Sequence, residues 1–512
     1  MPEYFVHPLI KKDTIERREY QEAILKTCLA GDTLCVLPTG TGKTAIAIML
    51  AAHRLALFPQ SSIVVLAPTR PLAEQHKKSF EACLNIVEPV ALLTGKIPPQ
   101  KREKMYKEAR VIVATPQTIK NDIERFIFDL SDISLIVVDE CHRSVKKYAY
   151  PFIIKKYFEI AKNPRVLGMT ASPGSDIERI NEVKANLHAE FVEIRTEQDK
   201  DVANYIKPVS IEWIKVDLDG ELAMIQRLLK DVLMTHINRL KAFNIYVHSK
   251  KDLLLAQQKL QRSLAEGKKI SLFYIISFVS ETLKVWHAIE LLETQSISAL
   301  KSYIEKLRED KSKGAQRLIK DEKFKKAMDL IWGYNDEHPK IKKLAEMLAE
   351  IYKNNQSVKV ILFSHYRDNI AMLYEIAKNI NGCMPVMLVG QSSGTSKING
   401  QNQKQQINNI RDFDAGTFNC LITSPVGEEG LHIPSVDIAI FYEPIASEIR
   451  TIQRKGRVGR VKTGKIIFLI TRKTRDEANY WVSKRKEESM KRILKGMKKE
   501  KNLTSFLGSE HL

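Results

Sequence analysis

The chain has 512 residues, of which 44% are hydrophobic, and its 81 lysines and arginines outnumber its 61 acidic residues. This apolar content excludes a disordered chain, and the length predicts about three domains. The net charge of +20 favours a polyanionic partner but does not distinguish DNA, RNA and a membrane surface.

The first third of the chain alternates short apolar strands with helical stretches. The strands are predicted at 34–37, 63–67, 111–114, 135–138 and 166–169. They are apolar without alternation, which is typical of strands buried on both faces of a parallel sheet. A first α/β domain is therefore predicted over residues 1–215.

A helical segment follows over residues 216–337. Apolar residues from Leu222 to Leu233 recur at helical spacing, and no proline occurs between residues 220 and 332. We predict an all-helical domain inserted between two sheets. Its basic residues either contact phosphate or form a solvated helix face. Examples are Lys250, Lys251, Lys268 and Lys269.

The alternation of strands and helices returns in the last third of the chain. Strands are predicted at 358–363, 386–389, 419–423, 437–441 and 466–470. They indicate a second α/β domain over residues 338–480. The polar segment 391–406 is interpreted as a mobile loop or, alternatively, as a nucleic-acid contact. Residues 481–512 form a basic helical tail, for which a solvated helix and a nucleic-acid arm both stay open.

Membrane insertion and export are not expected. No apolar run reaches the roughly 18 residues of a membrane span, and the N-terminal residues lack the pattern of a secretory signal. The six cysteines are scattered without a C-x-x-C pair, so reduced cysteines are predicted instead of disulfides or a zinc site. We expect a cytoplasmic protein, associated with the nucleoid if its source is prokaryotic.

A candidate phosphate-binding loop follows the first predicted strand and precedes an Ala/Ile-rich helix. It consists of Pro38, Thr39, Gly40, Thr41, Gly42, Lys43 and Thr44. Glycines let backbone N–H groups surround phosphate oxygens, and a helix N-terminus favours an anion. Lys43 would reach the β- and γ-phosphates of ATP, and Thr44 would hold Mg²⁺. Leu37 stands where the strict pattern has glycine, but the Gly-x-Gly-Lys-Thr core is intact.

Two carboxylates end the apolar strand at 135–138. Asp139 would bind Mg²⁺, directly or through water, and Glu140 would polarise the water that attacks the γ-phosphate. The alternative interpretation is an acidic turn at a strand end. A phosphate-binding loop about one hundred residues earlier favours the nucleotide site.

These motifs resemble those of superfamily 2 helicases, above all the archaeal Hef and eukaryotic FANCM helicases, with a wider similarity to RIG-I and Dicer helicases. The similarity covers nearly the whole chain. It implies two RecA-like domains that close on one ATP, and a helical insertion that recognises nucleic-acid structure. Asp139-Glu140-Cys141-His142 resembles the DExH box in a DECH form, and Cys141 replaces the alanine common in Hef relatives.

The resemblance adds residues to the ATP site from both domains. Arg18 and Gln21 lie in a segment similar to the one that reads adenine in the family. Gln453, Arg457 and Arg460 lie in motif VI, where the two arginines would be arginine fingers. Such fingers contribute roughly 10³–10⁵ in rate in other phosphoryl-transfer enzymes. Because they belong to the second domain, hydrolysis would require domain closure.

The family motifs that hold the nucleic-acid backbone follow predicted strands, at the edge where open α/β sheets bind ligands. The implied contact residues are Thr69, Arg70, Gly95, Thr115, Ser364, Gln403 and Thr423. His142, Thr170 and Ser172 would couple hydrolysis to strand movement. His432 stands where relatives often carry aspartate in motif V, a departure that affects a ribose contact.

The resemblance implies an ATP-dependent DNA helicase or translocase that moves 3′ to 5′ and remodels forked and branched DNA at stalled replication forks. The alternative is a double-stranded RNA-stimulated ATPase of the RIG-I or Dicer type, since 2′-hydroxyl recognition cannot be read from these motifs. The intact Lys43 and Glu140 argue against a non-catalytic binding module. No nuclease motif is found, so nuclease activity is not expected, and a separate nuclease or a sliding clamp is a candidate partner.

Overall fold

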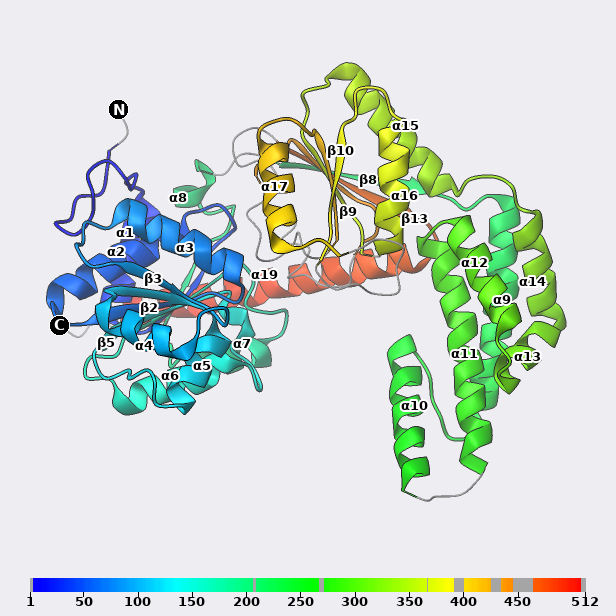
Figure 1. Cartoon of the computed structure of the whole chain (residues 1–512), viewed down its shortest axis with the longest axis horizontal. Helices are drawn as coiled ribbons and strands as arrows, with labels where there is room; N and C mark the ends of the chain where they lie inside the picture. Colours follow the sequence, from blue (N-terminus) through cyan, green and yellow to red (C-terminus); the bar gives the residue numbers. More distant parts are fainter. Residues whose placement is uncertain are drawn as a thin grey trace.

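The structure of the protein is a computed structural model that describes residues 3–205, 209–266, 271–365, 367–390, 400–424, 434–444 and 464–507. Two parallel sheets with flanking helices form two α/β domains, and long helices form a third domain (Figure 1). This architecture confirms the predicted fold of two α/β domains with an all-helical domain between them.

The first domain contains a seven-stranded sheet with the order β3-β4-β2-β5-β6-β1-β7. All neighbouring strands are parallel. The strands are β1 (Thr33–Val36), β2 (Ser62–Leu66), β3 (Val90–Leu93), β4 (Val111–Ala114), β5 (Ile133–Asp139), β6 (Val166–Thr170) and β7 (Phe191–Ile194). The five predicted strands are confirmed. The two strands that were not predicted, β3 and β7, form the edges of the sheet, where burial constrains the sequence less.

The helices of this domain lie on both faces of the sheet. They are α1 (Glu19–Ala30), α2 (Lys43–Leu57), α3 (Arg70–Cys83), α4 (Pro99–Glu108), α5 (Pro116–Glu124), α6 (Ala149–Ile160), α7 (Ile177–Asn186) and α8 (Lys200–Ala203), with the 3₁₀ turn η1 (Cys141–Arg143). Alternate side chains of the strands enter two separate cores, one with α2 and one with α6. Burial on both faces explains why the strands are apolar without alternation.

The second domain contains a six-stranded parallel sheet with the order β10-β11-β9-β12-β13-β8. Its strands are β8 (Val209–Val216), β9 (Val360–Phe363), β10 (Pro385–Leu388), β11 (Cys420–Thr423), β12 (Ile438–Phe441) and β13 (Gly464–Thr471). Its helices include α15 (Pro339–Asn354), α16 (Arg367–Lys378) and α17 (Gln403–Asp414). The predicted boundary at residue 215 is wrong, because β8 pairs with β13 along its whole length. The chain therefore enters the second domain before it forms the insertion.

In the part of the chain that the structure describes, six helices form the inserted domain. They are α9 (Gly220–Lys241), α10 (Lys250–Ala265), α11 (Ser271–Thr294), α12 (Ile297–Glu309), α13 (Lys313–Lys320) and α14 (Glu322–Gly333). Side-chain caps define most of their starts, since a polar oxygen accepts an otherwise unpaired backbone N–H of the first turn. The capping residues are Asp219, Ser249, Ser296, Ser312 and Asp321. The apolar faces of the helices share one core.

Helix α11 corrects the expectation that no segment is long and apolar enough to span a membrane. Its residues Leu272–Thr294 meet that criterion by length and composition. In the fold, α11 lies against α9, α10, α12 and α13. Its Glu281 and Glu290 form ion pairs with Arg317 and Lys250. Burial within the helical domain accounts for part of this apolar composition, since 39% of the apolar stretch is buried, whereas Phe273 and Tyr274 at its start are 58% and 56% exposed.

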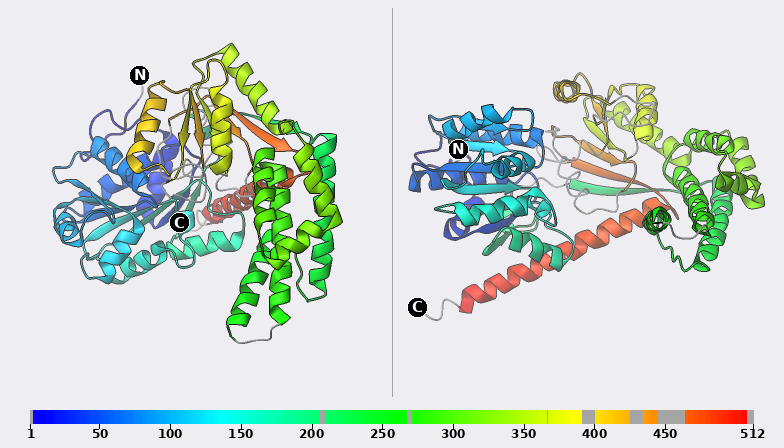
Figure 2. Two further views of the ribbon diagram at one scale, coloured as in Figure 1. Left: turned by 45° about the vertical axis from the view of Figure 1, so that its right-hand side comes forward. Right: turned by 60° about the horizontal axis from the view of Figure 1, so that its bottom comes forward.

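Helix α19 (Arg475–Leu507) links the three domains. It begins beside β13 and α11 and runs to the first domain, where Met490 and Leu494 are each only 4% exposed (Figure 2). Residues 481–507 of the predicted tail therefore continue a helix that starts at Arg475. Its Met490 face packs on the first domain, which corrects the interpretation of a fully solvated helix.

A buried carboxylate lies where the second domain meets the helical domain. Glu443 is 3% exposed, and it accepts hydrogen bonds from the hydroxyl of Ser364 at 3.1 Å and from the backbone N–H of His365 at 2.9 Å. Asn369 also donates to Glu443 and, at 3.2 Å, to the carbonyl of Thr294 at the end of α11. Glu443 therefore helps to fix the helical domain to the second sheet.

The stability of this junction is expected to depend on pH. Burial raises the pKa of Glu443 from 4.5 to about 7, although the positive charge of Lys340 acts in the opposite direction and Asp476 adds to the increase. Between these two pH values the folded protein binds more protons than the unfolded chain, so its stability falls as pH rises, by at most about 1.4 kcal/mol per pH unit.

The matched variant for this prediction is Glu443→Gln, which cannot titrate. Denaturant unfolding at several pH values should show the wild type losing stability relative to this variant between pH 4.5 and about 7, with no further change above that range. Parallel pH profiles of the two proteins would contradict a raised pKa of Glu443.

Candidate ATP site

The candidate phosphate-binding loop connects β1 to α2. Gly40 and Gly42 have φ angles of 81° and 77°, in the left-handed region that favours glycine. A Cβ atom on Gly42 would lie 2.5 Å from Nε2 of Gln21. The hydroxyl of Thr41 donates to the carbonyl of Pro38 at 2.7 Å. The loop is thus held in shape, with its last residues at the N-terminus of α2, where an anion is favoured.

Lys43 is the first residue of α2, and its side chain folds over the loop. Its Nζ donates to the carbonyls of Leu37 at 3.0 Å and Pro38 at 3.1 Å. Two carbonyl contacts hold the ammonium group against the loop backbone. A phosphate bound by the loop would therefore meet a positive charge at once, as the predicted role of Lys43 requires.

Asp139, the last residue of β5, lies deep in the same site. Its Oδ2 is 2.8 Å from Nε2 of His76 in α3, and its Oδ1 accepts the backbone N–H of Glu140 at 2.9 Å. Burial raises the pKa of Asp139, but the hydrogen bond from His76 and the positive charge of Lys43 outweigh burial and lower it. The carboxylate is thus kept ionised, as a metal ligand must be.

The donor set of this site suits Mg²⁺ bound together with a nucleotide. No group of three or more His, Cys, Asp or Glu side chains that could hold a metal occurs among the residues that the structure describes. Mg²⁺ usually binds one or two carboxylates, several waters and substrate phosphates. Asp139 and the hydroxyl of Thr44, the second residue of α2, would supply the protein ligands, and the remaining ligands would come from ATP and water.

Glu140 has a strained backbone at the start of η1. Its φ and ψ angles are 47° and 48°, a left-handed conformation that costs a residue with a Cβ atom about 1–3 kcal/mol. Its Oε2 lies 3.2 Å from Nδ1 of His142. Strained residues persist where the surroundings fix them, and they are concentrated at functional sites. The strain marks Glu140 as a candidate functional residue, and its role in orienting the attacking water stays a prediction.

The three predicted coupling residues are in contact with one another. Nδ1 of His142 lies 3.1 Å from Oγ1 of Thr170, at the end of β6. The backbone N–H of Ser172 donates to the same Oγ1 at 3.0 Å. With the contact between His142 and Glu140, these residues form a continuous polar chain from the ATP site to the loop after β6. Their role in coupling stays a proposal.

Gln21 contacts the phosphate-binding loop. Its Nε2 donates to the carbonyl of Thr41 at 3.1 Å, and the hydroxyl of Tyr20 donates to the same carbonyl at 2.5 Å. Arg18 pairs with Glu16 at 2.8 Å, and its guanidinium lies 4.9 Å from the ring centroid of Tyr205. The structure thus joins α1 to the loop, and adenine recognition by Arg18 and Gln21 stays a prediction.

The predicted nucleic-acid contacts occur at the carboxyl ends of strands in both sheets. Thr69 precedes α3 after β2, and Thr115 precedes α5 after β4. Gly95 follows β3, Ser364 follows β9, and Thr423 ends β11. A shared edge is where open parallel sheets bind ligands. The placement is compatible with the predicted contacts but does not show nucleic acid there.

The remaining two predicted nucleic-acid contacts are Arg70 and Gln403. Arg70 forms an ion pair with Glu74 at 2.7 Å, so a phosphate would compete with that carboxylate. Gln403 is the first residue of α17.

Several predicted features lie outside the described residues. They are Lys268, Lys269, the segment 391–399, His432, Gln453, Arg457 and Arg460.

Two residues of the site were missed from the sequence. His76 contacts Asp139, and Tyr20 binds the phosphate-binding loop. His76 is the one polar residue among the buried positions of α3, Ala73, His76 and Phe80. A histidine on an apolar helix face is a signal in the sequence, because a buried polar side chain needs a hydrogen-bond partner. Tyr20 adjoins Gln21, and only the fold shows that both reach the same carbonyl.

A Gly-x-Gly-Lys-Thr loop beside a strand-end Asp-Glu-Cys-His, in the first of two parallel α/β domains, defines a helicase of the DExH-box class. Comparison with known families supports this class. Residues 18–180 match the DEAD/DEAH box helicase family, and residues 339–462 match the helicase conserved C-terminal domain. Residues 221–338 match a helical bundle described from a putative ATP-dependent RNA helicase.

The chain belongs to the Hef family of superfamily 2 ATP-dependent helicases. The crystal structure of the Pyrococcus furiosus Hef helicase domain is 41% identical, and the match has a TM-score of 0.74 and covers 93% of this chain and 100% of that domain. The shared architecture includes both α/β domains and the helical domain between them.

Curated relatives are longer than this chain. A putative ATP-dependent RNA helicase of Methanocaldococcus jannaschii is 39% identical over 96% of this chain and 63% of its own length. The ATP-dependent DNA helicase MPH1 of Pyricularia oryzae is 35% identical over 93% of this chain and 45% of its own length. The chain therefore spans less than two thirds of these relatives.

Proposed function

We propose that this chain uses ATP hydrolysis to move 3′ to 5′ along one DNA strand and to unwind or remodel forked and branched DNA. The observation that carries the proposal is that the ATP site and the candidate contacts share the carboxyl edges of parallel sheets. The loop after β1, Asp139 and Thr170 lie at that edge of the first sheet, as do Thr69 and Thr115. Hydrolysis and strand binding would therefore use adjacent loops of one domain.

The net charge of +20 supports a polyanionic partner for this motor. DNA is favoured as that partner because two similar helicases, MPH1 of Pyricularia oryzae and fml1 of Schizosaccharomyces pombe, are named ATP-dependent DNA helicases. A double-stranded RNA-stimulated ATPase is the second candidate, since the Methanocaldococcus jannaschii relative is named an RNA helicase. We assign recognition of the branch to the helical domain, and we keep a nuclease or a sliding clamp as candidate partners.

A panel of nucleic acids tests the proposal. ATP hydrolysis with Mg²⁺ is measured with single-stranded DNA, a forked DNA, a four-way junction and an RNA duplex at one fixed salt concentration, because phosphate contacts make binding salt-dependent. We expect the fork and the junction to stimulate hydrolysis most, and we expect strand displacement from forks whose tracked tail ends 3′.

The Glu140→Gln protein is the matched control, because it should bind the same substrates without displacing strands. Hydrolysis that no DNA stimulates, with no strand displacement, would refute the proposal. Stronger stimulation by the RNA duplex than by any DNA would support the second candidate instead.

A further inference from the structure

The first turn of α19 is fixed to both the helical domain and the second domain. Arg475 pairs with Glu290 of α11 at 2.9 Å, and its backbone N–H donates to Glu293 of α11 at 3.0 Å. The next residue, Asp476, forms a fully buried ion pair with Lys340 in the first turn of α15. These contacts tie the start of α19 to the junction of two domains.

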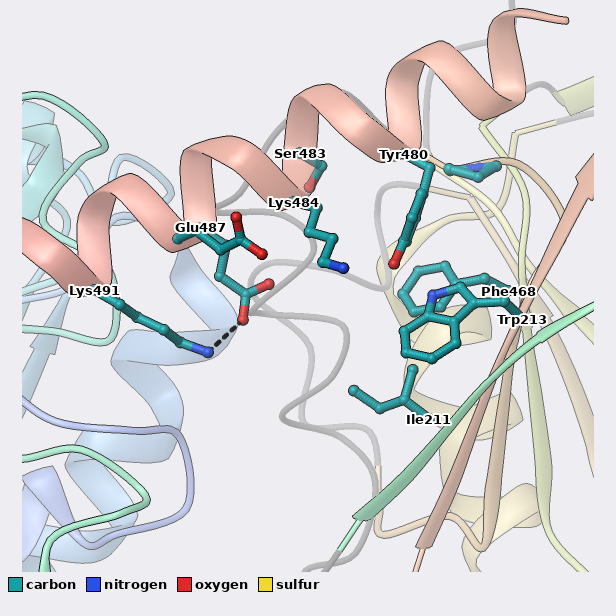
Figure 3. A pocket seen from close by; sticks show the side chains of 10 residues that line it. Ile211, Trp213, Phe468, Tyr480, Ser483, Lys484, Glu487 and Lys491 are labelled. Atoms are coloured by element: carbon teal, nitrogen blue, oxygen red, sulfur yellow. Dashed lines mark hydrogen bonds and ion pairs between the residues drawn. The ribbon is translucent and has the colours of Figure 1, made fainter. Parts of the chain in front are cut away.

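Beyond this turn α19 diverges gradually from the second sheet. Tyr480 still packs on the sheet, with its ring centroid 5.8 Å from that of Phe468 and 6.2 Å from that of Trp213. A cavity of about 170 Å³, lined by these side chains and by Lys484, lies between the helix and strands β8 and β13 (Figure 3). Past Tyr480, close packing against the sheet fixes the helix less, since an empty space of this size offers no partner atoms. Between Tyr480 and the first domain, the direction of α19 is therefore set mainly by its first turn and by its contacts around Met490.

A second fixed part of α19, near the middle of the helix, lies on the first domain at the loop that follows β6. The hydroxyl of Ser172 donates to Sδ of Met490 at 3.0 Å, and the hydroxyl of Ser489 donates to the carbonyl of Ser175 at 3.1 Å. Met490 and Leu494 enter the same apolar core as Cys141 of the DECH box. The turn of α19 that contains Ser489 and Met490 thus contacts the predicted coupling loop directly.

The contact of Met490 continues the polar chain of the ATP site. Ser172 bonds to Thr170, Thr170 lies against His142, and His142 lies against Glu140. From Arg475 to Met490 the helix rises about 22 Å, and a continuous α-helix transmits a shift of one end to the other. A movement of the helical domain or the second domain would therefore reach Ser172 through Met490.

We propose that Met490 is a positioning residue for the loop of Thr170, Ala171 and Ser172, and that α19 couples that loop to the position of the other two domains. Met490 does not touch ATP or nucleic acid in this scheme. It holds the Ser172 hydroxyl so that the chain to Glu140 keeps its geometry. This inference rests on the proposed motor function of the same site.

The test compares two single substitutions, made in separate proteins, on one buried face of α19. Met490→Leu keeps the apolar volume but removes the sulfur that accepts from Ser172, and such swaps are well tolerated in cores. Leu494→Met, one helical turn further, is the matched control because it changes the same core by a reverse swap of similar size. We measure DNA strands displaced per ATP hydrolysed, KM for ATP, and amide hydrogen exchange in residues 170–175.

For Met490→Leu we expect roughly two- to tenfold fewer strands displaced per ATP, the effect of one lost hydrogen bond, with KM for ATP unchanged. Hydrogen exchange in residues 170–175 should become faster. Leu494→Met should match the wild type in all three measurements. In a Ser172→Ala background, Met490→Leu should cause no further loss, because the donor of the hydrogen bond is already gone.

Equal coupling and equal hydrogen exchange in the Met490→Leu and Leu494→Met proteins would overturn the role of Met490. Additive losses in the double variant would overturn it as well. If the wild type shows no DNA-stimulated hydrolysis, the proposed function fails. Hydrogen exchange alone then tests the positioning role of Met490. Unchanged exchange in Met490→Leu overturns the positioning role, and faster exchange supports it.

Discussion

Replacement of Glu140 by glutamine is expected to leave ATP binding intact and to lower the rate of hydrolysis by roughly 10²–10⁴, the usual contribution of a positioned general base. The amide keeps the shape of the carboxylate but cannot accept the proton of the attacking water. Its backbone need not change, because glutamine meets the same steric cost as glutamate in the left-handed conformation of this position. Binding of a fluorescent ATP analogue and single-turnover hydrolysis separate the two effects.

Lys43→Ala is the contrasting variant for this prediction. It removes the ammonium group that lies against the carbonyls of Leu37 and Pro38, so it should weaken ATP binding as well as hydrolysis. Hydrolysis by the Lys43→Ala protein at the wild-type rate would contradict the role of Lys43. A Glu140→Gln protein that hydrolyses ATP normally would show that another residue orients the water.

The sequence predicted those parts of the fold that depend on local pattern. Strand β5 is buried along its whole length, so its apolar run can be recognised in the sequence without knowledge of the neighbouring strands. Strand β8 has mostly exposed side chains, and its place is set by pairing with β13 more than 240 residues later. No local pattern encodes such a pairing, so the boundary at residue 215 was drawn too late.

The same distinction applies to the candidate site. Lys43 and Asp139 were predicted because each belongs to a motif that directly follows its own strand. His76 is 63 positions from Asp139 in sequence, and only the packing of α3 on the sheet that contains β5 brings the two together. Met490 was missed for the same reason, because its partner Ser172 is 318 positions away. Contacts between elements and between domains are therefore what the sequence could not supply.

The second large effect is expected from Asp476→Asn, which should destabilise the domain junction by about 3–5 kcal/mol. Asp476 and Lys340 have fully buried side chains, and Lys340 also lies 4.6 Å from the ring centroid of Tyr442. Removing the negative charge leaves a buried ammonium group without its counter-ion. Calorimetric unfolding, analysed as separate transitions because the chain has several domains, measures the loss.

The double variant Lys340→Met/Asp476→Leu separates the cost of an unpaired charge from the value of the pair. Replacing a buried ion pair by apolar residues of similar size is often neutral or stabilising, so we expect it to recover most of the stability lost in Asp476→Asn. A double variant as unstable as Asp476→Asn would show instead that the junction needs the ion pair itself. Since Asp476 also fixes the first turn of α19, Asp476→Asn should reduce strand displacement per ATP even at temperatures where the protein stays folded. The double variant should restore that coupling only if apolar packing alone can hold the helix in place.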